Sequence, residues 1–149
     1  MILISHRGNT NGRFDSYENE PTYIDLAISR GYEVEIDVWF VDGMLYLGHD
    51  APQYGINLSF LVERKDKLWI HTKNFDALST LIETDLRIFY HEKENHTIIN
   101  NTKNIWSHKL SEANNKSIIP LLDKDDALKS IDFEHVFGIC SDYVESIKI

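Results

Sequence analysis

The segment at residues 32–38 constrains the fold more than any other part of this sequence. In a β-strand successive side chains alternate, so three aliphatic residues would lie on one face and Glu35 and Asp37 on the other. Two carboxylates on a buried face repel each other and lose hydration. A divalent cation bound through oxygen would neutralise them. The alternative is an edge strand whose acidic face lies in water.

The residues before this segment complete a βαβ unit. Residues 2–5 form a short apolar run, which predicts a buried strand that ends at His6-Arg7-Gly8. Pro21 suits the first turn of a helix, and Gly31 is typical of the position just after a helix. A strand, a helix and a strand in this order predict a right-handed crossover between two parallel strands.

The strand and helix pattern continues to residue 91, and the helices then become scarce. Asp42-Gly43 predicts a hairpin turn that brings Gly48-His49-Asp50 back toward the end of the acidic strand. The patterns predict helices at residues 58–62 and after Asn74, with strands at 68–73 and 86–91. Later strands are expected at residues 97–99, 104–106, 117–121 and 136–139, and helical segments only at 125–129 and 141–147.

This pattern is typical of an α/β fold with a parallel sheet, formed here by a single domain over residues 1–149. A complete eight-stranded α/β barrel normally needs at least ~200 residues. We therefore expect a compact, degenerate or incomplete TIM (β/α) barrel that lacks several helices in its C-terminal half. A homodimer would be one way to cover its apolar strand edges.

Charge and hydropathy exclude several classes of partner. The chain has 15 basic and 24 acidic residues, a formal charge of −9, whereas a general nucleic-acid binder presents a basic face. An anionic substrate would therefore need a metal ion or a local cationic cluster. Cys140 is the single cysteine, which excludes an internal disulfide. Because we find neither a secretion signal nor an apolar run of ~18 residues, we expect a cytoplasmic protein without stable membrane insertion.

Ionisable residues recur where parallel strands would end, which is where α/β folds place their active sites. They are His6, Arg7, Glu35, Asp37, His49, Asp50, His71, Lys73 and His91. We place His96, His108 and His135 at the surface. Trp106 is assigned mainly to the core. Asp142 is expected to cap the last helix, and the orientation of a catalytic imidazole is its alternative role.

Several short motifs follow one another in the first third of the chain. They are Ser5-His6-Arg7-Gly8, Glu18-Asn19, the acidic strand with its Glu35-Ile36-Asp37, Asp42-Gly43 and Gly48-His49-Asp50. In order and spacing they resemble the glycerophosphodiester phosphodiesterases, which belong to the phospholipase-C-like phosphodiesterase superfamily of TIM barrels. Each motif alone is weak, and it is their combination that is specific.

The resemblance implies metal-dependent hydrolysis of a phosphodiester, such as a glycerophosphodiester of lipid metabolism. His6 and His49 would be the general acid and base. The phosphate would be bound by Arg7 and Lys73. His91 is a further candidate for phosphate binding because of its place at the end of a predicted strand, and a structural role is its equal alternative. The metal, Mg²⁺ or Ca²⁺ in the family, would be held by Glu35 and Asp37, with Glu18 beside it or positioning His6. This agrees with the chemistry, because phosphodiester cleavage needs charge neutralisation and two proton transfers.

One position departs from the family pattern. His71 stands where the family usually has a glutamate two residues before the lysine that matches Lys73. Imidazole binds Mg²⁺ and Ca²⁺ poorly and suits Zn²⁺, Mn²⁺ or Fe²⁺. Either the metal preference has shifted, or His71 contacts phosphate, or metal binding is weakened. The alternative functions are therefore a catalytically impaired barrel that binds phosphate esters as a sensor, and a related enzyme that cleaves phospholipid head groups.

Overall fold

The computed structural model describes residues 1–128 and 135–147. Strands alternate with short helices in the first half, and strands dominate the second half. In chain order the elements are β1 (Ile2–His6), α1 (Pro21–Ser29), β2 (Glu33–Val41), β3 (Met44–Leu47), β4 (Tyr54–Ile56), α2 (Leu58–Glu63), β5 (Leu68–Thr72), α3 (Phe75–Leu81), β6 (Ile88–Phe89), β7 (His96–Ile98), β8 (Ile105–Ser107), η1 (Leu110–Glu112), β9 (Ser117–Pro120), α4 (Lys124–Leu128), β10 (Gly138–Ser141) and η2 (Val144–Ser146).

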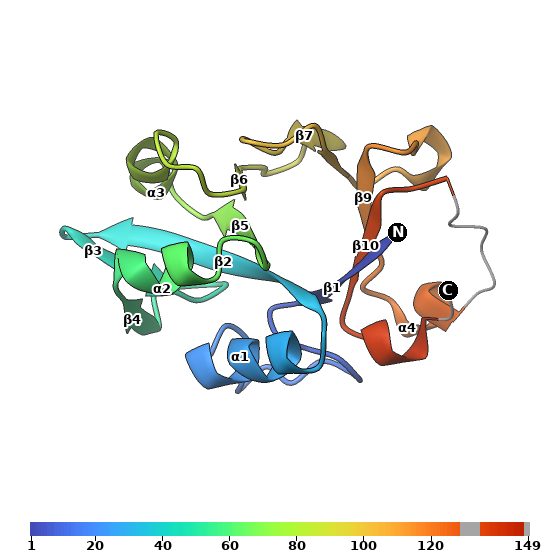
Figure 1. Cartoon of the computed structure of the whole chain (residues 1–149), viewed down its shortest axis with the longest axis horizontal. Helices are drawn as coiled ribbons and strands as arrows, with labels where there is room; N and C mark the ends of the chain where they lie inside the picture. The colour runs from blue at the N-terminus through green and yellow to red at the C-terminus, as the bar shows by residue number, and fades with distance from the viewer. Residues whose placement is uncertain (129–134, 148–149) are drawn as a thin grey trace.

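The strands form one curled sheet that surrounds an interior (Figure 1). Its parallel wall runs in the order β6, β5, β2, β1, β10, β9 and β8, with β3, β4 and β7 added antiparallel. Among the described residues β6 and β8 do not pair as strands. One backbone hydrogen bond of 2.8 Å joins β6 to the loop before β8, from the Asn100 N–H to the Ile88 carbonyl. The expected mixed α/β fold with few helices is confirmed, and the curled sheet is compatible with an incomplete barrel.

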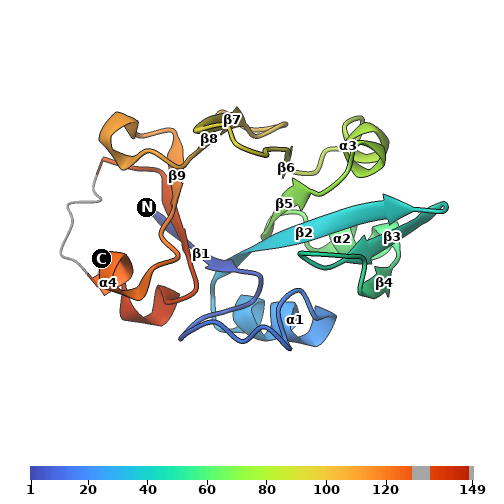
Figure 2. The same cartoon turned by 180° about the vertical axis from the view of Figure 1, so that it is seen from behind.

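The two faces of β2 divide the core as the alternation of its side chains predicts. Val34, Ile36 and Val38 pack outward against side chains of α1, α2, α3 and β3. The helices α1, α2 and α3 lie outside the curled sheet on this side, as seen from the front and from behind (Figures 1 and 2). Burying each aliphatic side chain stabilises the fold by about 1.5–3 kcal/mol. Glu35 and Asp37 are thereby turned toward the interior.

Several elements differ in detail from the prediction. The strand expected at residues 86–91 is only Ile88–Phe89, and the pair expected at 97–106 is an antiparallel hairpin of β7 and β8. The strand β4 was not predicted, because a three-residue edge strand has too short a pattern to recognise. The prediction of a helix at 141–147 is wrong at Ser141, which belongs to β10 and pairs with Ser5. Within that range only Val144–Ser146 is helical. Residue 129 of the predicted 125–129 helix lies outside the described residues.

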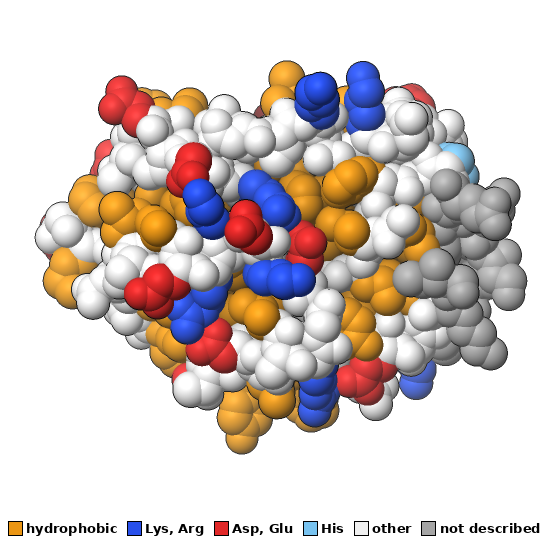
Figure 3. Space-filling model, in the orientation of Figure 1, with side chains coloured by type: hydrophobic (Ala, Val, Ile, Leu, Met, Phe, Trp, Pro, Cys, Tyr) orange, Lys and Arg blue, Asp and Glu red, His pale blue; other side chains and the backbone are white. Residues whose placement is uncertain are grey.

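The surface mixes charges of both signs. Acidic and basic side chains alternate across the face in Figure 3, with hydrophobic side chains between them. One ordered pair joins Arg64 to Asp25, with nitrogen–oxygen distances of 2.6 and 2.9 Å. Exposed pairs of this kind contribute at most about 1 kcal/mol each. In the described part of the chain, every helix is too short or too polar to cross a bilayer.

Candidate functional site

A cavity of about 390 Å³ opens where the parallel strands end. Most of the residues singled out in the sequence line it: His6, Arg7, Glu35, His49, His71, Lys73 and His91. Asp37 lies beneath its wall with no exposed surface, and Glu18 is buried. The strand ends therefore bring together residues that are up to 85 positions apart in the sequence, from His6 to His91.

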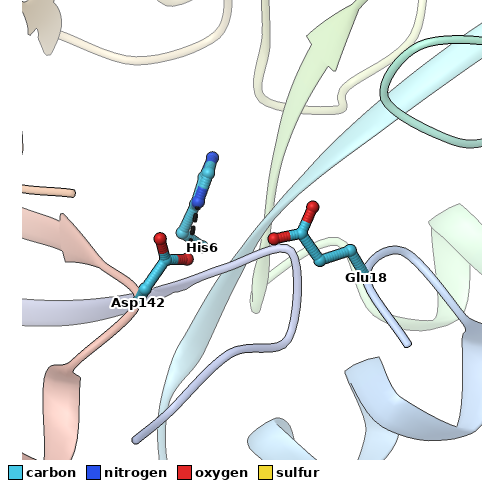
Figure 4. Close-up of side chains that lie close together, drawn as sticks. All are labelled: His6, Glu18 and Asp142. Atoms are coloured by element: carbon cyan, nitrogen blue, oxygen red, sulfur yellow. Dashed lines mark hydrogen bonds and ion pairs between the residues drawn. The ribbon is translucent and has the colours of Figure 1, made fainter. Parts of the chain in front are cut away.

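His6 is oriented by a carboxylate from the other end of the chain. β1 and β10 are parallel neighbours in which Ser5 pairs with Ser141, so the residues that follow them, His6 and Asp142, also lie side by side. The Nδ1 atom of His6 lies 2.8 Å from Oδ1 of Asp142 (Figure 4). A carboxylate only accepts, so Nδ1 carries the proton and Nε2 is left as the basic nitrogen. Nε2 lies 3.8 Å from Oε2 of Glu35. The predicted capping role of Asp142 is wrong, because no side chain caps η2 at its N-cap position, Tyr143. Asp142 instead contacts an imidazole, as in its alternative role, and a catalytic part for that imidazole stays a prediction.

Asp142 stays charged because its neighbours donate to it. Burial disfavours the charge, but hydrogen bonds from His6 and from the Asn9 amide, which lies 2.8 Å from the same oxygen, outweigh burial and lower the pKa of Asp142. Figure 4 shows the ring of His6 standing above Asp142, with Glu18 on the adjacent loop. The pair therefore combines a fixed ring with a permanent negative charge behind it.

Two residues next to the site have left-handed backbones that are unusual outside glycine. Arg7 has φ = 55° and Asn19 has φ = 62°. The Arg7 N–H donates to the Glu35 carbonyl at 2.8 Å, and the Asn19 N–H donates to the Arg7 carbonyl at 3.0 Å. Such conformations cost of order 1–3 kcal/mol and cluster at functional sites. Here they turn the chain after β1 so that the Arg7 side chain enters the interior.

Arg7 and Glu18 form one buried ion-pair system. Nη1 of Arg7 donates to Oε2 of Glu18 at 3.0 Å, and Nε of Arg7 lies 2.9 Å from Oδ2 of Asp37. Burial opposes the charge of Arg7, but Asp37 and Glu35 outweigh it and raise its pKa. The Asn9 amide donates to the other oxygen of Glu18 at 2.9 Å. Glu18 thus lies in one group with His6 and Asp142, apart from the group of Glu35, Asp37 and His71. The resemblance implied a place for Glu18 beside the metal or a role in positioning His6.

Glu35, Asp37 and His71 form a compact trio between β2 and β5. Asp37 and His71 are register partners, and Nδ1 of His71 lies 3.1 Å from Oδ1 of Asp37 and 4.0 Å from Oε1 of Glu35. One ligand atom from each residue lies within 4.8 Å of the others. Burial raises the pKa of Asp37, but the hydrogen bond from His71 and the charge of Arg7 outweigh it, so the pKa is lowered.

Glu35 lacks the partners that stabilise Asp37. Its side chain is 3 % exposed, and among the described residues its Oε2 atom has no hydrogen-bond partner. Burial, followed by repulsion from Asp37, raises the pKa of Glu35. A buried carboxylate oxygen without a donor is costly. Two carboxylates and an imidazole are donors that divalent cations accept, so these residues fit a metal ion.

Carboxylates outnumber permanent cations in and beside the interior. The buried carboxylates of the two groups are Glu18, Glu35, Asp37 and Asp142. Nε of Arg7 lies 2.9 Å and Nζ of Lys73 lies 3.5 Å from Asp37, and Nε of Arg13 lies 3.4 Å from Oε1 of Glu18. None of these three cations lies within ion-pair distance of Glu35 among the described residues, so a bound cation would have room to act there.

His49 reaches the same cavity from the loop after β3. The Gly48 N–H donates to the Asp37 carbonyl at 3.2 Å, and Trp39 Nε1 donates to the Gly48 carbonyl at 2.6 Å, so the loop is fixed to β2. Nδ1 of His49 lies 2.7 Å from Oδ1 of Asp50. Burial and the charge of Arg7 lower the pKa of His49. Its ring is therefore mainly neutral at neutral pH.

Aromatic rings and further imidazoles form the opposite part of the cavity lining. His91 stacks on His71 with centroids 4.4 Å apart, and His108 contacts His91 edge-on at 4.8 Å. Burial and the neighbouring His71 lower the pKa of His91 to about 4. His108 is exposed as predicted, yet it also lines the cavity, which the prediction missed although the residue directly follows β8. Trp106 is buried in the core and lines the cavity as well.

Two asparagines organise the site and were not predicted as site residues. The Asn19 amide donates to Oδ2 of Asp37 at 2.9 Å, and its Oδ1 accepts from the Asp37 N–H at 2.9 Å. Asn9 donates to both Glu18 and Asp142. Asn19 stands within a recognised motif, so a signal existed. Nothing in the sequence distinguishes Asn9 as a site residue, because polar residues are common in polar loops.

Comparison with protein-family models and with curated proteins finds no match to this chain. The resemblance to the glycerophosphodiester phosphodiesterases therefore rests on the short motifs of the chain itself.

Proposed function

We propose that this protein is a metal-dependent phosphodiesterase that hydrolyses a glycerophosphodiester or a similar small phosphodiester, on a degenerate TIM-type barrel. The observation that carries the proposal is the shared cavity: two imidazoles, His6 and His49, line it together with Arg7, Lys73 and the carboxylate of Glu35. Phosphodiester cleavage needs positive charge at the phosphoryl oxygens and two proton transfers. The cavity holds groups for each requirement.

The mechanism follows from the positions of these side chains. A divalent cation held by Glu35, Asp37 and His71 would supply positive charge at the phosphoryl oxygens. Asp142 keeps Nδ1 of His6 protonated, so Nε2 takes the proton of the attacking oxygen, and Asp142 stabilises the imidazolium that forms. The second ring, His49, gives a proton to the leaving oxygen from its imidazolium form, which is the minor form at neutral pH because burial and the charge of Arg7 lower its pKa. Each such transfer typically contributes ~10²- to 10⁴-fold in rate.

A binding module without catalysis is the second candidate, and a specific feature favours it. Arg7, the group expected to bind phosphate, already contacts Glu18 and Asp37. His71 replaces the third carboxylate that the resemblance leads us to expect. In this second proposal the cavity binds phosphate esters and the protein responds to them without turning them over.

The deciding experiment measures hydrolysis of glycerophosphocholine, glycerophosphoethanolamine and glycerophosphoglycerol with each of Mg²⁺, Ca²⁺, Mn²⁺ and Zn²⁺. We expect turnover with at least one substrate and one metal. His6→Ala and His49→Ala should each lower it ~10²-fold or more. His135→Ala is the matched control, because this histidine is exposed and remote from the cavity lining.

Two outcomes would reject the enzyme proposal. One is a His6→Ala/His49→Ala double variant as active as the wild type. The other is an absence of turnover under all metals together with a rise in the melting temperature on adding glycerol 3-phosphate, which would establish the binding module. Circular dichroism of each variant verifies that the fold is retained.

A further inference from the structure

The trio of Glu35, Asp37 and His71 contains a nitrogen donor among its oxygen donors. We infer that its cation is a transition-series ion, Zn²⁺, Co²⁺ or Mn²⁺, in preference to Mg²⁺ or Ca²⁺, with His71 as a direct ligand through Nδ1. This inference rests on the metal site of the proposed function and deepens it. Mg²⁺ and Ca²⁺ prefer oxygen, whereas imidazole suits the transition-series ions.

The direction of the His71 ring separates this role from phosphate binding. Its Nδ1 atom faces the carboxylates, 3.1 Å from Asp37 and 4.0 Å from Glu35. Without metal Nδ1 donates to Asp37, so an ion bound through Nδ1 would replace this hydrogen bond and leave the ring proton on Nε2. Donor atoms around one ion with bonds of about 2.1 Å lie roughly 3–3.5 Å apart. The observed separations therefore need only a small contraction around Glu35. A nitrogen that pointed into the open cavity instead would favour contact with substrate.

A buried oxygen of Glu35 without a hydrogen-bond donor is the independent sign of a ligand site here, and Nε2 of His6 lies 3.8 Å from it. Oε2 is buried and accepts no hydrogen bond from the described residues, whereas both oxygens of Asp37 have cationic or amide partners. An acceptor that carries negative charge in such surroundings is stabilised by a cation. The trio thus has both a donor set and a vacant acceptor.

The surroundings hold His71 and Asp37 in fixed orientations. The His71 ring stacks on Phe89 at 5.2 Å and on His91 at 4.4 Å, with both interplanar angles at 6°. Asn19 binds both the side chain and the N–H of Asp37. Groups that orient metal ligands typically contribute ~10- to 100-fold in affinity. This trio is therefore preorganised for a mixed nitrogen and oxygen site.

The test measures metal binding, without reference to turnover. The protein is treated with chelator, dialysed and titrated by calorimetry with Zn²⁺, Co²⁺, Mn²⁺, Mg²⁺ and Ca²⁺ in separate experiments. We expect one site that binds Zn²⁺ or Co²⁺ at least ~100-fold more tightly than Mg²⁺. His71→Glu should lower this ratio ~10-fold or more, because it makes a three-carboxylate site. His135→Glu, at an exposed histidine that does not line the cavity, should leave the ratio unchanged.

A second measurement needs no variant. Wild-type protein loaded with one equivalent of Mn²⁺ should show ¹⁴N coupling from a bound imidazole in pulsed electron paramagnetic resonance. Equal affinities for Zn²⁺ and Mg²⁺, an unchanged ratio in folded His71→Glu, or a lack of ¹⁴N coupling would each overturn the inference. Hydrolysis supported by Mg²⁺ would then still uphold the proposed function. Conversely, tight binding that depends on His71 without any hydrolysis would reject the function and retain the metal site.

Discussion

At the scale of single residues, Asp142 determines which ring nitrogen of His6 carries the hydrogen. The carboxylate accepts the Nδ1 proton at 2.8 Å, and this leaves Nε2 facing the cavity as a base. An amide at position 142 would still fill the same space. It would lack the negative charge, and it could donate to Nδ1 and so reverse the tautomer. In the proposed function the residue would therefore act through His6 as a positioning residue.

Asp142→Asn should lower kcat/KM for the phosphodiester by about 10²-fold or more, since the comparable change in a Ser-His-Asp triad costs ~10⁴-fold. We expect KM to change little, because Asp142 does not line the cavity. Steady-state kinetics across the pH range measures both constants. A variant with wild-type kcat would show that the pair has only a structural role. Asp66→Asn, at an exposed carboxylate that does not line the cavity, is the control for a change of charge alone.

The same carboxylate should make stability depend on pH. Its pKa is lowered in the folded protein, so it binds protons less readily than an unfolded aspartate, whose pKa is about 3.9. Asp142 therefore stabilises the fold fully above that value, and the contribution is lost as the pH falls through the lowered pKa. Urea unfolding from pH 7 to pH 3 should give a difference between wild type and Asp142→Asn that shrinks below about pH 4. A difference that stays constant with pH would contradict this.

At the scale of secondary-structure elements, local patterns predicted what local interactions determine. The alternation in β2 predicted that Glu35 and Asp37 face inward, and Pro21 begins α1 as expected. The contact between His6 and Asp142 could not be predicted in this way. It depends on β1 and β10 being neighbours, and no local pattern encodes the pairing of strands 136 positions apart.

The loop between β3 and β4 is the element that carries His49, and Gly48 determines its path. Gly48 has φ = 148°, and a Cβ atom there would collide with the backbone oxygen of Ala51. Gly48→Ala should therefore displace His49 and lower both the melting temperature and kcat. Gly31→Ala is the matched control, since Gly31 has φ = 95° with open space around it and would incur only the backbone strain. Equal effects of the two variants on kcat would refute this role of Gly48.

At the scale of the whole molecule, the interior of the curled sheet concentrates negative charge that the core alone does not stabilise. Burial and repulsion from Asp37 raise the pKa of Glu35, so its ionised form opposes folding when no cation is bound. A buried charge without a partner can cost several kcal/mol. If Glu35 binds the proposed cation, function and stability are in conflict at this position, as is common for active sites.

Glu35→Gln should resolve that conflict in favour of stability. With chelator present at neutral pH, we expect the variant to melt at a higher temperature than the wild type, since ~1 kcal/mol corresponds to roughly 2–4 °C for a chain of this size. Adding Zn²⁺ at about 100 times its dissociation constant should stabilise the wild type by about 2.7 kcal/mol and the variant far less, because a ligand is missing. Calorimetric melting with and without metal measures both effects, and Glu63→Gln, at an exposed carboxylate, is the control. If Glu35→Gln melts lower than the wild type in chelator and gains equally from Zn²⁺, then Glu35 is a structural carboxylate, and its buried charge is stabilised by His6 and Arg7 without a metal ion.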